Sequence, residues 1–125
     1  MQSGLYIVAT PIGNLSDMSP RAIDVLRSVD LIAAEDTRVF GKLAAHFDIK
    51  TKRISCHEHN ERDVVPELIE KMQNGLSVAA VSDAGMPGIS DPGFRLVRAA
   101  REAGLDVFVV PGPVAAISAL VLSGF

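Results

Sequence analysis

Three acidic side chains stand directly after apolar stretches of the chain, where a buried strand would end. Glu35 and Asp36 follow the apolar residues 31–34, and Asp83 follows residues 77–81. A carboxylate at such a position can take a proton from a hydroxyl group or orient that group for attack. Asp36 could instead cap a following helix, because its side chain can accept from the free backbone N–H groups of a first turn. The sequence leaves both roles of Asp36 open.

Three loops rich in glycine and proline also follow apolar stretches: residues 10–14 (TPIGN), 82–93 (SDAGMPGISDPG) and 111–113 (PGP). Glycine lets backbone approach a ligand closely and proline keeps a loop stiff, as a site that binds a compact ligand through backbone groups requires. Turn geometry alone would explain one such loop, but three together favour a binding site. The candidate binding residues are Pro11, Gly13, Ser82, Asp83, Ala84, Gly85, Pro87, Ile89, Pro111 and Gly112.

Two common nucleotide-binding motifs do not occur in the sequence. A P-loop needs Gly-Lys-Ser or Gly-Lys-Thr, and Gly41-Lys42 is followed by Leu43. The dinucleotide-binding motif needs three glycines after the first strand, where the loop holds only Gly13. The sequence therefore disfavours phosphoryl transfer and NAD binding.

Side chains able to ligate a metal ion are concentrated in one short run, from Cys56 to His59. Successive side chains of a strand point to opposite faces, so Cys56 and Glu58 would lie opposite His57 and His59. We therefore expect no metal site.

The chain is weakly acidic as a whole but locally basic. It holds 12 Lys and Arg against 15 Asp and Glu, a formal net charge of -3, which argues against a protein that coats nucleic acid. Cations nevertheless outnumber acids between residues 38 and 62. Arg38, Lys52 and Arg53 are the candidate RNA-binding residues of this stretch, although a solvated helix face and loop would explain the same charges.

Apolar strands and amphipathic helices alternate along the chain. Ser19 and Asn60 are expected to cap helices, Asp91-Pro92 to begin one, and Gly75 to end one. Strands are expected at residues 5–9, 31–34, near 54, 77–81 and 107–110. Right-handed crossovers turn this order into an α/β fold, a mostly parallel five-stranded sheet with helices on both faces. The loops after its strands would meet at one edge, where ligands bind in such sheets.

The length of 125 residues fits one domain. The lone Cys56 cannot form an intramolecular disulfide, and we find no signal peptide or membrane span, so we expect a cytoplasmic protein without a membrane partner. Residues 114–125 are small or apolar on nearly every side, and a helix there would need a partner. We expect a missing second domain, a dimer interface, or both.

Together these motifs resemble the N-terminal domain of the tetrapyrrole methylase superfamily, and within it the branch that methylates ribosomal RNA. The resemblance extends from end to end of the chain, and Met86, Gly88 and Val114 depart from its expected pattern. It is carried by LYIVATPIGNL (5–15), DLIAAEDTR (30–38), HEHNE (57–61), VSDAGMPGISDPG (81–93) and VPGPVAA (110–116). The segments EDTR, His59-Asn60 and the SDAG…SDPG loop are typical of the RNA-methylating branch.

The resemblance implies S-adenosylmethionine as cofactor and the 2′-oxygen of a cytidine ribose in small-subunit (16S) rRNA as methyl acceptor. It also implies a homodimer of two-domain subunits that acts on the rRNA or the assembled small ribosomal subunit, with residues 1–125 as the N-terminal domain and a C-terminal domain absent. Glu35, Asp36 or Asp83 would then be the catalytic base, and Arg38 would hold an RNA phosphate. A tetrapyrrole methyltransferase and a non-catalytic binding fragment are the alternatives.

Overall fold

The computed structural model describes residues 1–10, 18–81 and 91–110, with only the backbone described for 91–94. Five strands form one sheet in the order β3-β2-β4-β1-β5, and every strand pair is parallel. The strands are β1 (Gly4–Val8), β2 (Leu31–Ala34), β3 (Arg53–Ser55), β4 (Ser77–Val81) and β5 (Val107–Val110). The α/β fold with a five-stranded parallel sheet, expected from the alternation of elements, is confirmed.

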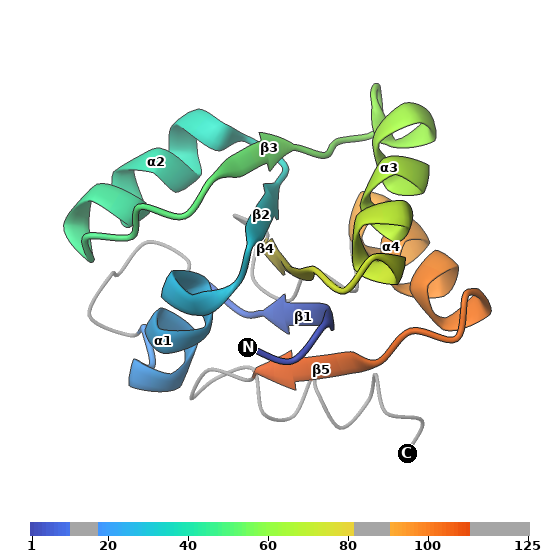
Figure 1. Cartoon of the computed structure of the whole chain (residues 1–125). Helices are drawn as coiled ribbons and strands as arrows, with labels where there is room; N and C mark the ends of the chain where they lie inside the picture. Colours follow the sequence, from blue (N-terminus) through green and yellow to red (C-terminus); the bar gives the residue numbers. More distant parts are fainter. Residues whose placement is uncertain (11–17, 82–90, 111–125) are drawn as a thin grey trace, which may run out of the picture.

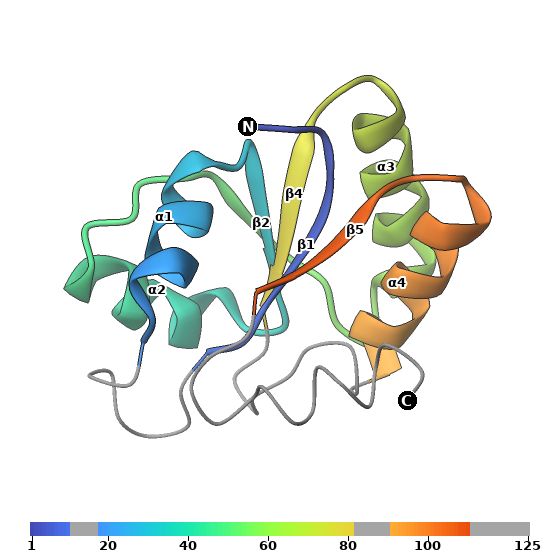
Figure 2. The same ribbon diagram turned by 90° about the horizontal axis from the view of Figure 1, so that it is seen from below.

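Two pairs of helices cover the two faces of the sheet (Figures 1 and 2). The helices α1 (Pro20–Ser28) and α2 (Thr37–His46) lie on one face, and α3 (Glu61–Gln73) and α4 (Asp91–Glu102) lie on the other. In β1, Tyr6 and Val8 pack with the first pair, whereas Leu5 and Ile7 pack with the second. This division follows from the alternation of side chains along a strand and explains why the central strands are continuously apolar.

The helix ends follow local chemistry, with one exception. The Ser19 hydroxyl accepts from the backbone N–H of Ala22 at 3.1 Å and so caps α1 as predicted. Gly75 follows α3 with a φ of 96°, a conformation that favours glycine. The expectation that the Asn60 side chain caps α3 is wrong. Asn60 occupies the cap position, but its Oδ1 accepts from the His57 N–H at 2.8 Å and its Nδ2 donates to the Ser55 carbonyl at 3.0 Å.

Within the described part of the chain, no helix is long and apolar enough to cross a membrane.

Candidate functional site

The ends of three neighbouring strands define the candidate site. Val8 of β1 pairs in register with Val81 of β4 on one side and with Val110 of β5 on the other. The chain therefore leaves the sheet at three adjacent points, all at the same edge (Figure 2). These are the points where the three glycine- and proline-rich loops begin.

The crossovers from β1 and β4 go to opposite faces of the sheet. The chain continues from β1 to α1 on one face, and from β4 to α4 on the other, although the two strands are neighbours. In open α/β sheets, ligands bind outside the carboxyl ends of two such strands. The strand order thus indicates a binding position between the carboxyl ends of β1 and β4, which the sequence alone did not.

The candidate binding residues themselves belong to the segments beyond the described residues, as do the departures Met86, Gly88 and Val114. The candidates concerned are Pro11, Gly13, Ser82, Asp83, Ala84, Gly85, Pro87, Ile89, Pro111 and Gly112. Among the described residues at this edge, Ala9 and Thr10 follow β1 and are buried. A polar side chain thus lies among apolar strand ends at the head of the first loop.

Asp36 lies at the same edge, after β2, and caps α2. Its Oδ1 accepts from the backbone N–H of Arg38 at 2.9 Å and of Val39 at 3.4 Å. The hydrogen bond from the Arg38 N–H is the main reason that the pKa of Asp36 lies below its ordinary value. A carboxylate stabilised in this way is a weaker base. The cap accounts for Asp36 without a catalytic role.

Glu35, in contrast, acts on Cys56, which packs in the apolar cluster on the α3–α4 face of the sheet. Burial, and after it the negative charges of Glu61 and Glu35, raise the pKa of the Cys56 thiol to about 11. Both carboxylates therefore act on the same buried thiol, which follows β3. Glu35 itself is half-buried. These three groups lie where β2 and β3 end and α3 begins.

Sequence reasoning assigned no role to one member of this group, Glu61, the last residue of the HEHNE segment. Glu61 is 5% exposed, and its Oε1 lies 2.5 Å from Nη1 of Arg95 on α4. Its Oε2 is buried and has no hydrogen-bond partner among the described residues. The HEHNE segment marked this region, but no pattern in the sequence distinguishes a buried glutamate from an exposed one in the first turn of a helix.

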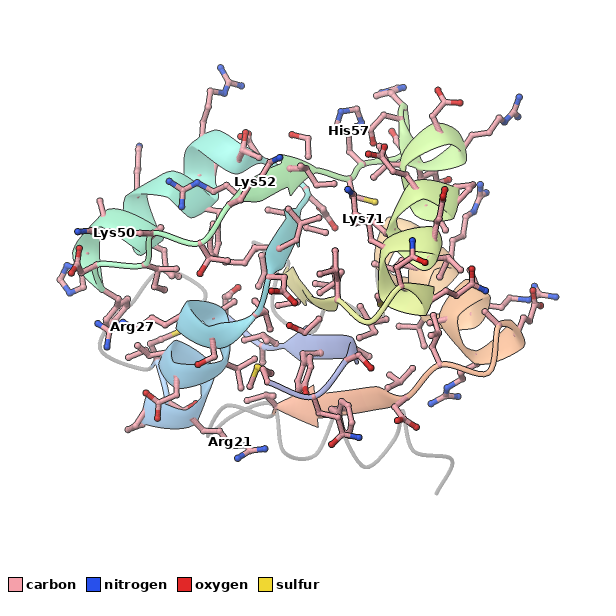
Figure 3. All side chains as sticks on the ribbon, in the orientation of Figure 1. Arg21, Arg27, Lys50, Lys52, His57 and Lys71 are labelled. Atoms are coloured by element: carbon pink, nitrogen blue, oxygen red, sulfur yellow. The ribbon has the colours of Figure 1, made fainter. Side chains whose placement is uncertain are left out.

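The turn before α3 is held by its own side chains. In addition to the bonds of Asn60, the backbone N–H of His59 donates to Nδ1 of His57 at 3.1 Å. Figure 3 shows His57 near the start of α3. Among the described residues, no three His, Cys, Asp or Glu side chains are arranged to hold a metal ion.

The structure separates the three candidate RNA-binding residues by exposure. Arg38 is 92% exposed, with its Nε 3.6 Å from Oδ1 of Asp36, and Lys52 is exposed as well. Arg53 is half-buried, and its guanidinium carbon lies 5.9 Å from the centre of the Phe40 ring. Packing against an aromatic ring gives Arg53 a structural role in addition to any contact with RNA.

Further cations accompany Lys52 on the same side of the molecule. Figure 3 shows Arg27, Lys50 and Lys52 on the side that α1 and α2 occupy. Arg27 donates to the carbonyl of Phe47 at the end of α2. Lys50 is 86% exposed and lies 3.9 Å from Asp48. Arg27, Lys50 and Lys52 are all exposed, so this side of the molecule carries positive charge at its surface.

Comparisons with known proteins agree with this architecture. The model of the family Tetrapyrrole (Corrin/Porphyrin) Methylases matches residues 4–125. Proteins named ribosomal RNA small subunit methyltransferase I from Synechocystis and Vibrio cholerae are each 58% identical to this chain over 120 residues, 96% of its length. The protein of that name from Escherichia coli O157:H7 is 54% identical over 123 residues. The chain spans 42–43% of the length of these relatives.

Solved structures share the fold at lower identity. The uroporphyrin-III-C-methyltransferase of Thermus thermophilus superimposes with a TM-score of 0.69 at 26% identity, covering 96% of this chain and 53% of that one. A cobalt precorrin-4 methyltransferase superimposes with a TM-score of 0.70 at 19% identity, covering 95% of this chain and 49% of that one. The family model matches almost the whole chain, and the chain belongs to the tetrapyrrole (corrin/porphyrin) methylase family.

Proposed function

We propose that this chain is the N-terminal domain of an S-adenosylmethionine-dependent methyltransferase that modifies the rRNA of the small ribosomal subunit. The observation that carries the proposal is the identity of 58% over 96% of the chain with proteins named for that activity. The solved porphyrin and corrin methyltransferases described above reach only 26% and 19%. The RNA-methylating branch is therefore favoured over the tetrapyrrole branch.

The described residues suit the proposed cofactor. The strand ends Val8, Val81 and Val110 are buried in the core and so fix the points where the three loops begin, and Thr10 adds a buried polar group at the head of the first loop. The loops after these strands supply Pro11, residues 82–89 and Pro111-Gly112 as the proposed backbone contacts. When bound, S-adenosylmethionine supplies the methyl carbon that the acceptor oxygen attacks.

The acceptor that we propose is the 2′-oxygen of a cytidine ribose. A ribose hydroxyl is a poor nucleophile, so the site must align it with the methyl carbon and accept its proton. Glu35 and Asp83 are the proposed bases. Asp36 is the weakest of the three candidates, because its carboxylate is engaged in the cap of α2. Arg38 and Lys52, both exposed, are the proposed phosphate contacts.

The proposal includes a homodimer, a cytoplasmic location and a C-terminal domain that completes the cofactor cleft. The support for the dimer is the apolar composition of residues 114–125. Sedimentation of the chain at micromolar concentration tests it. A monomer whose terminal segment exchanges its amide protons slowly would contradict the dimer.

Labelled methyl transfer tests the function directly. The full-length protein is incubated with S-adenosylmethionine carrying a tritiated methyl group and either small ribosomal subunits or uroporphyrinogen III. We expect label in the rRNA, and nucleoside analysis should recover it as 2′-O-methylcytidine. Label in the porphyrin instead would establish the alternative, a tetrapyrrole methyltransferase. A protein that binds S-adenosylmethionine without transferring label to either acceptor would be the non-catalytic alternative.

A further inference from the structure

Glu61 is a buried carboxylate that the proposed reaction does not use. It is the first residue of α3, at the edge of the sheet where the candidate site lies, and is only 5% exposed. Glutamate is rarely buried without a partner, because removal of a charge from water is costly. Its burial therefore needs a physical explanation.

The partner of Glu61 comes from the neighbouring helix. Nη1 of Arg95 lies 2.5 Å from Oε1 of Glu61, although the Arg95 side chain is 65% exposed. The guanidinium thus reaches from the surface to the buried carboxylate. Below this contact, Leu68 of α3 and Leu96 of α4 belong to the same apolar cluster. The ion pair joins the first residue of α3 to the beginning of α4.

Stability alone does not explain this pair. An ion pair with a buried partner gains little over well-packed apolar side chains, because desolvation offsets the attraction. In addition, Oε2 of Glu61 has no partner among the described residues, and Glu35 adds a second negative charge near Cys56. The charged pair therefore points to a role in positioning.

The position of Arg95 indicates what is positioned. The helix α4 begins at Asp91, so Arg95 lies about one turn inside it. The chain enters this helix from residues 82–90, which follow β4 at the candidate cofactor edge. If the start of α4 is held in place, the chain position that follows residue 90 is held as well. We propose that Glu61 is a positioning residue for cofactor binding, holding the start of α4 through Arg95. This inference rests on the proposed function.

Titration with S-adenosylmethionine tests the proposal. Calorimetry on the full-length protein compares the wild type with Glu61→Gln, which keeps the shape of the side chain but removes its charge, and with Arg95→Gln. The matched control is Glu102→Gln, which breaks the exposed Arg98–Glu102 ion pair of 3.1 Å at the other end of α4. We expect Kd for the cofactor to rise about tenfold in the first two variants, as loss of a positioning contact can cause. The control should bind like the wild type.

Two further readouts separate positioning from a purely structural role. Arg95→Lys should restore Kd to within about threefold of the wild type, because the ion pair is kept, and KM for the cofactor should rise in Arg95→Gln while kcat changes less than about twofold. If Glu61→Gln does not fold, the Arg95 variants decide, because that side chain is mostly exposed. Normal Kd in folded variants with lowered melting temperatures would overturn the inference. A wild-type protein that binds no S-adenosylmethionine would instead overturn the proposed function.

Discussion

At the scale of single residues, Asp36 shows how one side chain can be assigned by its bonds. Both of its hydrogen bonds go to backbone N–H groups of the first turn of α2, and these bonds lower its pKa. A general base needs a pKa nearer to the working pH. The cap of α2 and the catalytic base make different demands on the residue, so substitutions can separate them.

We predict that Asp36→Asn in the full-length protein keeps both the fold and methyl transfer, within about twofold. Asparagine is as good an N-cap as aspartate but cannot accept a proton. Asp36→Ala should instead lower the melting temperature, because the cap is lost. Melting curves and labelled methyl transfer measure the two effects. A folded Asp36→Asn protein with no activity would restore Asp36 as the base.

At the scale of elements, Asp30 and Ser77 join the start of β2 to the start of β4. Oδ2 of Asp30 accepts from the backbone N–H of Ser77 at 2.8 Å and from its hydroxyl at 3.0 Å. The backbone N–H of Asp30 donates in return to the Ser77 hydroxyl at 3.1 Å. These bonds, first of all the one from the Ser77 N–H, lower the pKa of Asp30 below its ordinary value of 3.8.

We predict that Asp30→Ala lowers the free energy of unfolding at pH 7 by about 1 kcal/mol. This loss is smaller than a hydrogen bond to a charged group usually contributes to stability, because Asp30 is exposed to water. Because the pKa of Asp30 is lower in the folded state, its carboxylate stabilises the fold fully above pH 3.8, and this stabilisation is lost as the pH falls through the pKa of the folded state. The difference in free energy of unfolding between wild type and Asp30→Ala should therefore shrink below pH 3.8. Urea unfolding between pH 7 and pH 2.5 measures this. Asp24→Ala, an exposed carboxylate on α1, is the control, and an equal loss there would contradict the prediction.

The start of β1 depends on a glycine. Gly4 has a φ of 132°, and a Cβ at this position would lie 2.7 Å from the carbonyl oxygen of Asp106, just before β5. We predict that Gly4→Ala destabilises the domain by more than about 1 kcal/mol, because both the backbone conformation and the contact resist a side chain. Gly41→Ala is the matched control. Gly41 lies within α2 with open space around it, so alanine there should stabilise by roughly 0.5–1 kcal/mol. Chemical denaturation gives the free energy of unfolding of both variants. Equal changes in the two would contradict the prediction.

The elements were predictable from the sequence, but their order in the sheet was not. Continuous apolar runs such as residues 77–81 and caps such as Ser19 are local signals, and the structure confirms the strand and helix that they predict. The insertion of β4 between β2 and β1 depends instead on contacts between distant segments. The pairing of Glu61 with Arg95 depends in turn on that order, because it requires α3 and α4 to lie together on one face. Local patterns therefore predicted that the loops meet at the carboxyl ends of the strands, but they predicted neither the strand order there nor the Glu61–Arg95 ion pair.

At the scale of the whole molecule, the two helical faces differ in how they would meet RNA. Arg38 in the first turn of α2 and Lys52 just before β3 are exposed, and Figure 3 shows Arg27 and Lys50 on the same side. Arg53, by contrast, lies half-buried against Phe40. On the α3–α4 face, Arg95 and Arg98 lie 2.5 and 3.1 Å from glutamates. Arg38 and Lys50 lie farther from their aspartates, at 3.6 and 3.9 Å, and are 92% and 86% exposed. The more loosely held cations of the α1–α2 side are therefore the better candidates for contact with phosphate groups.

We predict that Arg38→Ala and Lys52→Ala in the full-length protein each weaken RNA binding and reduce the slope of log K against log salt by about 1, because each removes one phosphate contact. Arg53→Ala should mainly lower the melting temperature, since its loss removes packing on Phe40. Arg98→Ala is the control, because it removes the same charge from the opposite face, where Arg98 is paired with Glu102. Filter binding of rRNA over a range of salt concentrations gives the slopes. If Arg98→Ala changes the slope as much as Arg38→Ala does, the effect is one of net charge, and the α1–α2 side loses its claim to the RNA.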